Sequence, residues 1–202
     1  MSHKVLFPLV LTFLSLTITK AQTFNGGLVL GMNATQIDGD NLAGYNNAGL
    51  VAGVYVFTEF SRNWRGLMEI KYSGKGAGTK KDNPNILKIR LNYVDVPFVA
   101  SYTPVENLWL EMGLSANYYF KGRIYQDGWN DLDEEPNPFD LMWLAGINYQ
   151  LLLNMSIGAR YSYSLMPVAG ENSLTTPWWV TPWHNDVVTF SLYFNILDRQ
   201  RF

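Results

Sequence analysis

The chain has 202 residues and a net charge of −2, and charged residues make up 16% of it. This length suits one domain, and the lack of a basic stripe argues against nucleic acid as a partner. Because the sequence contains no cysteine, disulfides and thiolate metal sites are excluded.

The first 21 residues have the pattern of a secretory signal peptide. Lys4 gives a short positive start, an apolar stretch follows from Val5 to Ile18, and Ala21 supplies a small residue for cleavage. We therefore expect residues 1–21 to be removed before Gln22, which leaves residues 22–202 as one exported barrel domain. The rest of the sequence has no run of about 18 apolar residues, the length that a transmembrane helix needs.

Eight segments alternate between apolar and polar residues with the period of two that indicates a β-strand. In chain order they span residues 24–36, 48–60, 65–74, 87–102, 107–120, 139–150, 153–166 and 185–197. Segment 107–120 is the clearest, because Leu110, Met112 and Leu114 share one face while Glu111 and Asn117 share the other. Strands of this length with one greasy and one polar face are typical of a transmembrane β-barrel.

The connections between these segments alternate in length. Short joins are expected at 61–64, 103–106 and 151–152, and long ones at 37–47, 75–86, 121–138 and 167–184. The Gly-rich residues 74–78 are expected to form a flexible outer loop. Tight periplasmic turns and long outer loops are the pattern of an outer-membrane barrel. The sequence therefore predicts an all-β fold, an eight-stranded antiparallel up-and-down transmembrane β-barrel in the bacterial outer membrane.

The polar faces carry six ionisable residues that should point into this barrel. They are Glu69, Lys71, Asp95, Glu111, Asp140 and Arg160. The lumen of an eight-stranded barrel is just wide enough to be filled by side chains, and a buried charge is costly unless it is paired. We expect an ion-pair network in which Lys71 and Arg160 sit among the carboxylates.

The sequence offers no catalytic, cofactor or metal site. His184 precedes Asn185 and Asp186 and is expected to be an exposed loop histidine, and no second element supports a nucleophile. No set of residues has metal-ligand spacing.

Aromatic residues have two expected roles. Seven of them lie near strand ends and should form girdles at the membrane surfaces, namely Tyr72, Tyr102, Tyr118, Phe120, Tyr149, Tyr161 and Tyr163. Trp178, Trp179 and Trp183 lie in a loop instead. They could enter the outer leaflet, pack over the barrel mouth or form a binding patch, and the sequence does not choose among these.

Three segments resemble the PorT-like outer-membrane β-barrel family of Bacteroidetes. They are residues 31–40 (Gly-Met-Asn-Ala-Thr-Gln-Ile-Asp-Gly-Asp), 93–98 (Tyr-Val-Asp-Val-Pro-Phe) and 156–164 (Ser-Ile-Gly-Ala-Arg-Tyr-Ser-Tyr-Ser). The resemblance extends from about residue 24 to residue 196. It implies an outer-membrane barrel rather than an enzyme, and the founding member of that family is associated with a secretion and gliding apparatus.

The functional expectation is a small non-catalytic barrel with a structural role or a binding role through its outer loops. Its expected partners are outer-membrane lipid or lipopolysaccharide and envelope proteins, with no cofactor. The alternatives are a soluble lipocalin-like barrel that binds an apolar ligand, an outer-membrane enzyme that uses His184, and an open pore. A lipocalin would place its apolar face inward, so the direction in which each face points decides between the first two architectures.

Overall fold

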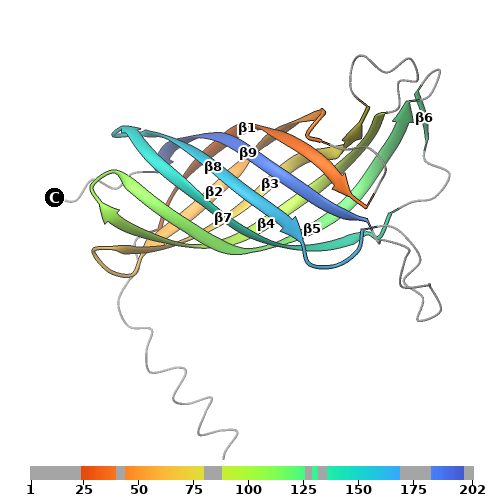
Figure 1. Ribbon diagram of the computed structural model, residues 1–202. Helices are drawn as coiled ribbons and strands as arrows, with labels where there is room; N and C mark the ends of the chain where they lie inside the picture. The colour runs from red at the N-terminus through yellow and green to blue at the C-terminus, as the bar shows by residue number, and fades with distance from the viewer. Residues whose placement is uncertain are drawn as a thin grey trace, which may run out of the picture.

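The computed structural model describes residues 24–39, 44–79, 88–125, 129–131, 136–168 and 183–197. The predicted signal peptide lies outside these ranges and stays a prediction. The described residues form nine strands: β1 (Phe24–Asp38), β2 (Asn47–Glu59), β3 (Trp64–Gly78), β4 (Lys88–Val105), β5 (Leu108–Tyr125), β6 (Trp129–Asp131), β7 (Phe139–Leu152), β8 (Met155–Ser164) and β9 (His184–Leu197) (Figure 1). Within these ranges, no helix is long and apolar enough to cross a membrane.

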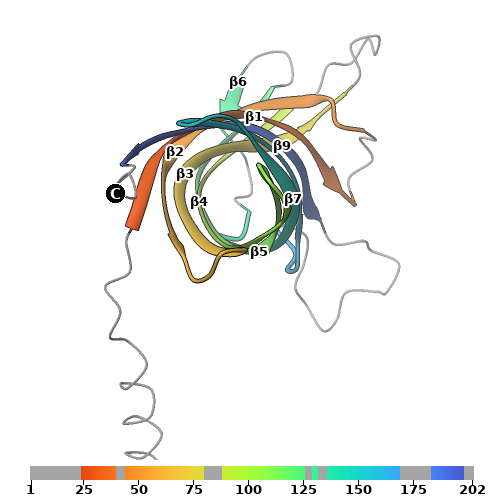
Figure 2. The same ribbon diagram turned by 90° about the vertical axis from the view of Figure 1, so that its left-hand side faces the viewer.

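Eight long strands close into a barrel. Each pairs antiparallel with its neighbours, and β1 pairs with β9 along Gly26–Asp38, which joins the two ends of the sheet. Figure 2 shows the resulting ring end on. The ninth strand, β6, pairs with the end of β5 alone among the described strands, opposite residues 123–125. The predicted eight-stranded antiparallel barrel is confirmed.

The two ends of the barrel differ in their connections, as predicted. The links at residues 60–63, 106–107 and 153–154 are short, and we call this side the short-turn end. Residue Asn107 has φ of 65° in one of these turns. All other links lie at the opposite side, the long-loop end.

Two strands continue past the points where the sequence predicted loops. β3 runs to Gly78, so the Gly-rich residues 74–78 are not the predicted flexible loop. β5 runs to Tyr125, and its last three residues pair with β6. Small residues often indicate a turn, whereas in β3 they permit close approach to β4. A Cβ on Gly76 would lie 2.0 Å from the carbonyl oxygen of Ile89. As a result, β3, β4 and β5 extend farther at the long-loop end (Figure 1).

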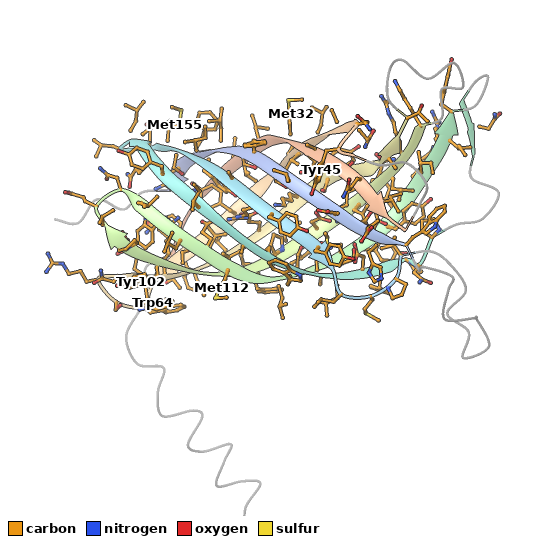
Figure 3. The ribbon with its side chains drawn as sticks, viewed as in Figure 1. Met32, Tyr45, Trp64, Tyr102, Met112 and Met155 are labelled. Atoms are coloured by element: carbon orange, nitrogen blue, oxygen red, sulfur yellow. The ribbon has the colours of Figure 1, made fainter. Side chains whose placement is uncertain are left out.

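The apolar face of each strand points outward. Leu110, Met112 and Leu114 are 44%, 67% and 50% exposed, whereas Glu111 between them is 4% exposed. Figure 3 shows Met32 and Met112 projecting from the outer surface of the ribbon. A lipocalin has the reverse arrangement, so that alternative is wrong.

Aromatic pairs mark both ends of the apolar band. Trp64 and Tyr102 have ring centroids 5.0 Å apart at the short-turn end (Figure 3). Toward the long-loop end, Tyr72 packs near Phe120 at 6.3 Å, and Tyr118 packs against its neighbour Phe139 on β7 at 5.3 Å. Rings at these positions match the girdles that amphipathic aromatics form at membrane surfaces.

Two apolar clusters fill parts of the interior. The first consists of Val29, Tyr55, Leu67, Val99, Leu144 and Tyr193. The second lies at the long-loop end and consists of Ile37, Ala77, Ile89, Leu91, Tyr93 and Tyr119, with Ile124 and Trp183 packed against it. The interior is therefore layered, and the ionisable residues lie near and between these clusters.

Candidate functional site

An ion-pair cluster crosses the barrel from one wall to the other. The Arg160 guanidinium on β8 donates from Nη1 to Glu69 Oε1 on β3 at 2.6 Å and from Nε to Glu111 Oε2 on β5 at 2.7 Å. Lys71 Nζ lies 2.9 Å from Glu69 Oε2, and Arg65 Nη2 lies 3.5 Å from Glu111 Oε1. We call these five residues the first ion cluster. Since β3 and β8 are four strands apart in either direction around the closed ring, the contact between Arg160 and Glu69 spans the lumen.

A glycine makes room for the central arginine. The register aligns Glu111 on β5 with Gly146 on β7, and Gly146 with Arg160 on β8. A Cβ on Gly146 would lie 2.6 Å from Arg160 Cγ. The missing side chain allows Arg160 to pass over β7 and reach Glu111. Aromatic side chains support the cluster, because Tyr193 donates to Glu69 Oε1 at 3.0 Å and Arg65 lies 4.0 Å from the centre of the Trp109 ring.

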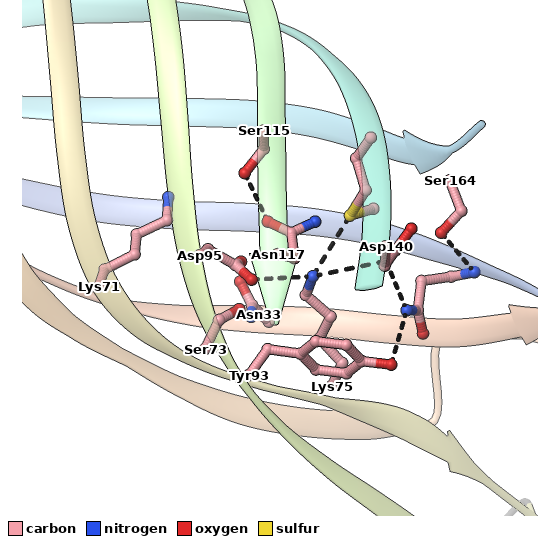
Figure 4. A network of polar contacts seen from close by, with 12 residues as sticks. Asn33, Lys71, Ser73, Lys75, Tyr93, Asp95, Ser115, Asn117, Asp140 and Ser164 are labelled. Atoms are coloured by element: carbon pink, nitrogen blue, oxygen red, sulfur yellow. Dashed lines mark hydrogen bonds and ion pairs between the residues drawn. The ribbon is translucent and has the colours of Figure 1, made fainter. Parts of the chain in front are cut away.

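A second ion cluster lies nearer to the long-loop end and consists of Lys75, Asp95 and Asp140 (Figure 4). Lys75 Nζ is 3.1 Å from Asp95 Oδ1 and 3.9 Å from Asp140 Oδ2, and it also lies 4.4 Å from the centre of the Tyr93 ring. Asn185 Nδ2 donates to Asp140 Oδ2 at 2.9 Å. A buried ammonium group with these partners replaces much of the hydration that it lost.

The two clusters balance in charge. Four carboxylates (Glu69, Asp95, Glu111 and Asp140) meet four cations (Arg65, Lys71, Lys75 and Arg160) in the ion pairs of the described residues. All six residues expected inside the barrel lie there, at 0–7% exposure. Two cations were missed, and with the six predicted residues alone the interior would carry a charge of −2.

The missed cations had a signal in the sequence. Lys75 continues the alternation of Leu67, Glu69, Lys71 and Ser73, but it stands among glycines, which favour a loop. Arg65 lies on the same face of the same strand, two residues before Leu67. Continuing the period of two in both directions would have found both residues.

Little free space remains around the charged side chains. A cavity of about 20 Å³ is lined by Lys71, Lys75, Asp95 and Arg160, together with uncharged residues. A cavity of this size holds about one water molecule. The described part of the chain contains no group of three or more His, Asp or Glu side chains that could hold a metal ion.

The structure describes two of the four residues singled out in the last long loop, Trp183 and His184. Trp183 packs against the second apolar cluster, which is the barrel-mouth position among the three alternatives, while Trp178 and Trp179 lie outside the described residues. The expectation that His184 is an exposed loop residue is wrong. His184 begins β9, is half-buried, stacks on Tyr163 at 5.6 Å, and has Nδ1 3.1 Å from the carbonyl oxygen of Ser164.

Two acidic residues, Asp38 on β1 and Asp186 on β9, lie on the outer face at the long-loop end. Asp186 accepts hydrogen bonds from Tyr45 Oη at 2.8 Å and from Gln36 Nε2 at 3.0 Å, and Asp38 nearby accepts from Tyr163 Oη at 3.0 Å. Burial, followed by the hydrogen bond to Asp186, raises the pKa of Tyr45 above its usual range. The tyrosine therefore remains a neutral donor at physiological pH.

Comparisons with known proteins agree with this architecture. Residues 20–170 match the model of the family described as "Outer membrane protein beta-barrel domain". No curated protein matches the sequence. Because the family match covers most of the chain, it places the protein in the bacterial outer membrane, with its short-turn end periplasmic and its long-loop end extracellular.

Two solved structures have the same fold. One is Ail, the attachment invasion locus protein of Yersinia pestis, with a TM-score of 0.54 and 13% identity over 85% of this chain and 98% of Ail. Ail has also been solved in complex with the heparin analogue sucrose octasulfate. The other is the Neisserial surface protein A, with a TM-score of 0.52 and 11% identity over 88% of this chain and all of that one. The chain belongs to the outer membrane protein beta-barrel domain family.

Proposed function

We propose that this protein is a closed, non-catalytic outer-membrane barrel that acts structurally or by binding at its extracellular end. One observation carries the proposal: Arg160 connects opposite walls of the barrel through Glu69 and Glu111, and the second ion cluster fills the next layer. Side chains that are paired in this way are fixed in place, because separating them would leave charges unpaired in a buried environment. Such a lumen obstructs the passage of solutes, so the open-pore alternative is disfavoured.

Conductance tests the closed lumen. Purified full-length protein inserted into planar lipid bilayers should give no discrete current steps at potentials that the bilayer itself withstands. Insertion should be verified on the same sample by protection of the strands from protease. Reproducible steps of uniform size from the wild-type protein would contradict the proposal.

The absence of catalysis is part of the same proposal. The enzyme alternative depended on an accessible His184, whereas this ring stacks on Tyr163 and its Nδ1 faces a backbone carbonyl. Replacing His184 by Ala should leave any hydrolytic activity of the purified barrel toward esters and peptides at the level of the wild-type preparation. A loss of activity in that variant would restore the enzyme alternative.

A finer assignment is proposed on the sequence resemblance alone. Residues 31–40, 93–98 and 156–164 favour the PorT-like members from Bacteroidetes, and the founding member's association with secretion and gliding makes envelope proteins of such an apparatus the expected partners. In-cell crosslinking from the extracellular end, followed by identification of the captured protein, tests this. Capture of unrelated abundant porins alone would count against it.

We also propose export through a signal peptide that is cleaved after Ala21. The intact mass of the protein purified from outer membranes should correspond to a chain that begins at Gln22. A mass that includes residues 1–21 would contradict this.

A further inference from the structure

Four basic residues share the outer face of the barrel beyond its extracellular girdle. They are Lys88 and Arg90 on β4 and Lys121 and Arg123 on β5, and all four are exposed. The register places Arg90 directly opposite Arg123. We call these four residues the basic patch. They lie on the part of the wall where β3, β4 and β5 extend beyond the remaining long strands (Figure 1).

A β-bulge places the β5 residues of the patch on the outer face. Tyr93 pairs with Tyr119, but Asn92 pairs with Lys121, so Phe120 is an extra residue on β5. Phe120 and Lys121 are consequently both exposed, and the alternation is inverted from there onward. If β5 alternated regularly through Phe120 with no bulge, Lys121 and Arg123 would point into the barrel.

Asn92 ties this bulge to the aromatic girdle. Its Nδ2 donates to the carbonyl oxygen of Lys121 at 2.9 Å, and its Oδ1 accepts a hydrogen bond from the Tyr72 hydroxyl. The Tyr72 ring in turn lies 6.3 Å from that of Phe120. The position of the basic patch relative to the girdle is therefore fixed by the structure.

The height of the patch matches the headgroups of the outer leaflet. Girdle rings lie at the membrane surface, and Lys121 is three residues beyond Tyr118, about 10 Å along the strand. Strand tilt shortens that distance along the membrane normal. In the outer leaflet of a bacterial outer membrane, this level is occupied by the phosphorylated sugars of lipid A.

We propose that the basic patch binds the phosphate groups of lipid A in the outer leaflet. Arginine guanidinium groups form paired, charge-assisted hydrogen bonds with phosphate. Arg90 and Arg123 lie directly opposite each other, so one phosphate group can contact both. On its other side, Arg123 lies opposite Asp131 of β6, so the phosphate would bind on the β4 side of Arg123. The lipid would bind on one side of the barrel, because the β1–β9 side carries Asp38 and Asp186 at the same end. This site does not depend on whether the lumen is closed.

A charge substitution with a matched control tests the site. Arg123→Gln removes one guanidinium from the patch, and Arg62→Gln removes one from an exposed turn at the periplasmic end. Fluorescent lipid A that retains its phosphates is titrated against the full-length protein in micelles of a neutral detergent, with polarisation as the readout. Arg123→Gln should weaken binding about fivefold, which corresponds to about 1 kcal/mol for one basic residue near an anionic headgroup. Arg62→Gln should bind as the wild type does.

Further arms distinguish lipid A from other anions. The double variant Arg90→Gln/Arg123→Gln should bind intact lipid A weakly. The wild type should bind dephosphorylated lipid A with the same low affinity or a lower one. Equal affinities of the two single variants for lipid A, or equal binding of intact and dephosphorylated lipid A, would overturn the proposal.

Displacement of lipid A by millimolar inorganic phosphate would assign the patch to free phosphate instead. Loss of heparin binding in Arg123→Gln with lipid A binding unchanged would assign it to a sulfated polysaccharide. Heat-modifiable gel mobility confirms that every variant is folded.

Discussion

Arg160 is the residue with the most demanding environment in the barrel. Its side chain is 4% exposed and neutralises two carboxylates that are themselves buried, Glu69 and Glu111. Removing one partner of a buried ion pair is strongly destabilising, because the remaining charge has neither water nor a counter-ion. The position of Arg160 opposite Gly146 shows that the backbone is adapted to this side chain.

Replacing Arg160 by Met should therefore lower the free energy of unfolding by about 3–5 kcal/mol. The measurement is guanidinium-induced unfolding in detergent micelles, followed by tryptophan fluorescence. Arg62→Met is the control, and it should change stability by less than about 0.5 kcal/mol because Arg62 is exposed in a turn. Similar losses in both variants would show that the first ion cluster does not stabilise the barrel.

At the residue scale, sequence alternation predicts which face a side chain occupies but not its partners. It placed six ionisable residues in the interior, and it paired Lys71 and Arg160 with carboxylates in general. It could not show that Lys75 reaches Asp95 and Asp140, because that contact depends on the stagger of strands around the ring. For Trp178 and Trp179, which lie outside the described residues, the three alternatives of the sequence analysis stay open.

Strand β3 is one of the two strands that continue well past their predicted ends. It continues through alternate glycines to Gly78, and Gly76 has φ of 137°, a conformation that residues with a side chain rarely adopt. Gly74 lies two residues earlier and has no positive φ. Its Cβ would come no closer than 3.2 Å to a neighbouring atom, Gly49 Cα.

Gly76→Ala should consequently destabilise the barrel by more than about 1 kcal/mol, while Gly74→Ala should cost less. Both variants can be compared by the midpoint of unfolding in guanidinium and by the folded fraction on a heat-modifiable gel. If Gly74→Ala proved the more damaging of the two, the extension of β3 along β4 would be in doubt.

At the element scale, the eight long strands could be predicted because each buries one face and exposes the other to apolar surroundings, which enforces a period of two. The sequence does not predict the bulge at Phe120 or the short strand β6. A bulge adds one residue and reverses the pattern from there onward, so the sequence predicts a polar loop at Lys121 and Arg123. β6 spans three residues, too few to show any period.

At the scale of the whole molecule, the barrel separates three environments. The outer band is apolar, and the interior combines two apolar clusters with ion pairs whose charges balance. The extracellular end carries a basic patch on β4 and β5 and acidic residues on β1 and β9. Which residues belong to the outer band and which to the interior depends on the direction in which each strand face points. If the faces were reversed, eight ionisable side chains would meet the acyl chains, at a cost of several kcal/mol for each basic residue near the bilayer centre.

Spin labelling tests that direction most directly. The chain has no cysteine, so Leu114→Cys and Ser61→Cys each provide a single labelling site, the first on the outer face of β5 and the second in a short turn. In lipid bilayers, the account predicts that the label at position 114 is relaxed by dissolved oxygen and hardly by a water-soluble nickel chelate, with the opposite ranking at position 61. A label at position 114 that is relaxed mainly by the nickel chelate would contradict the account.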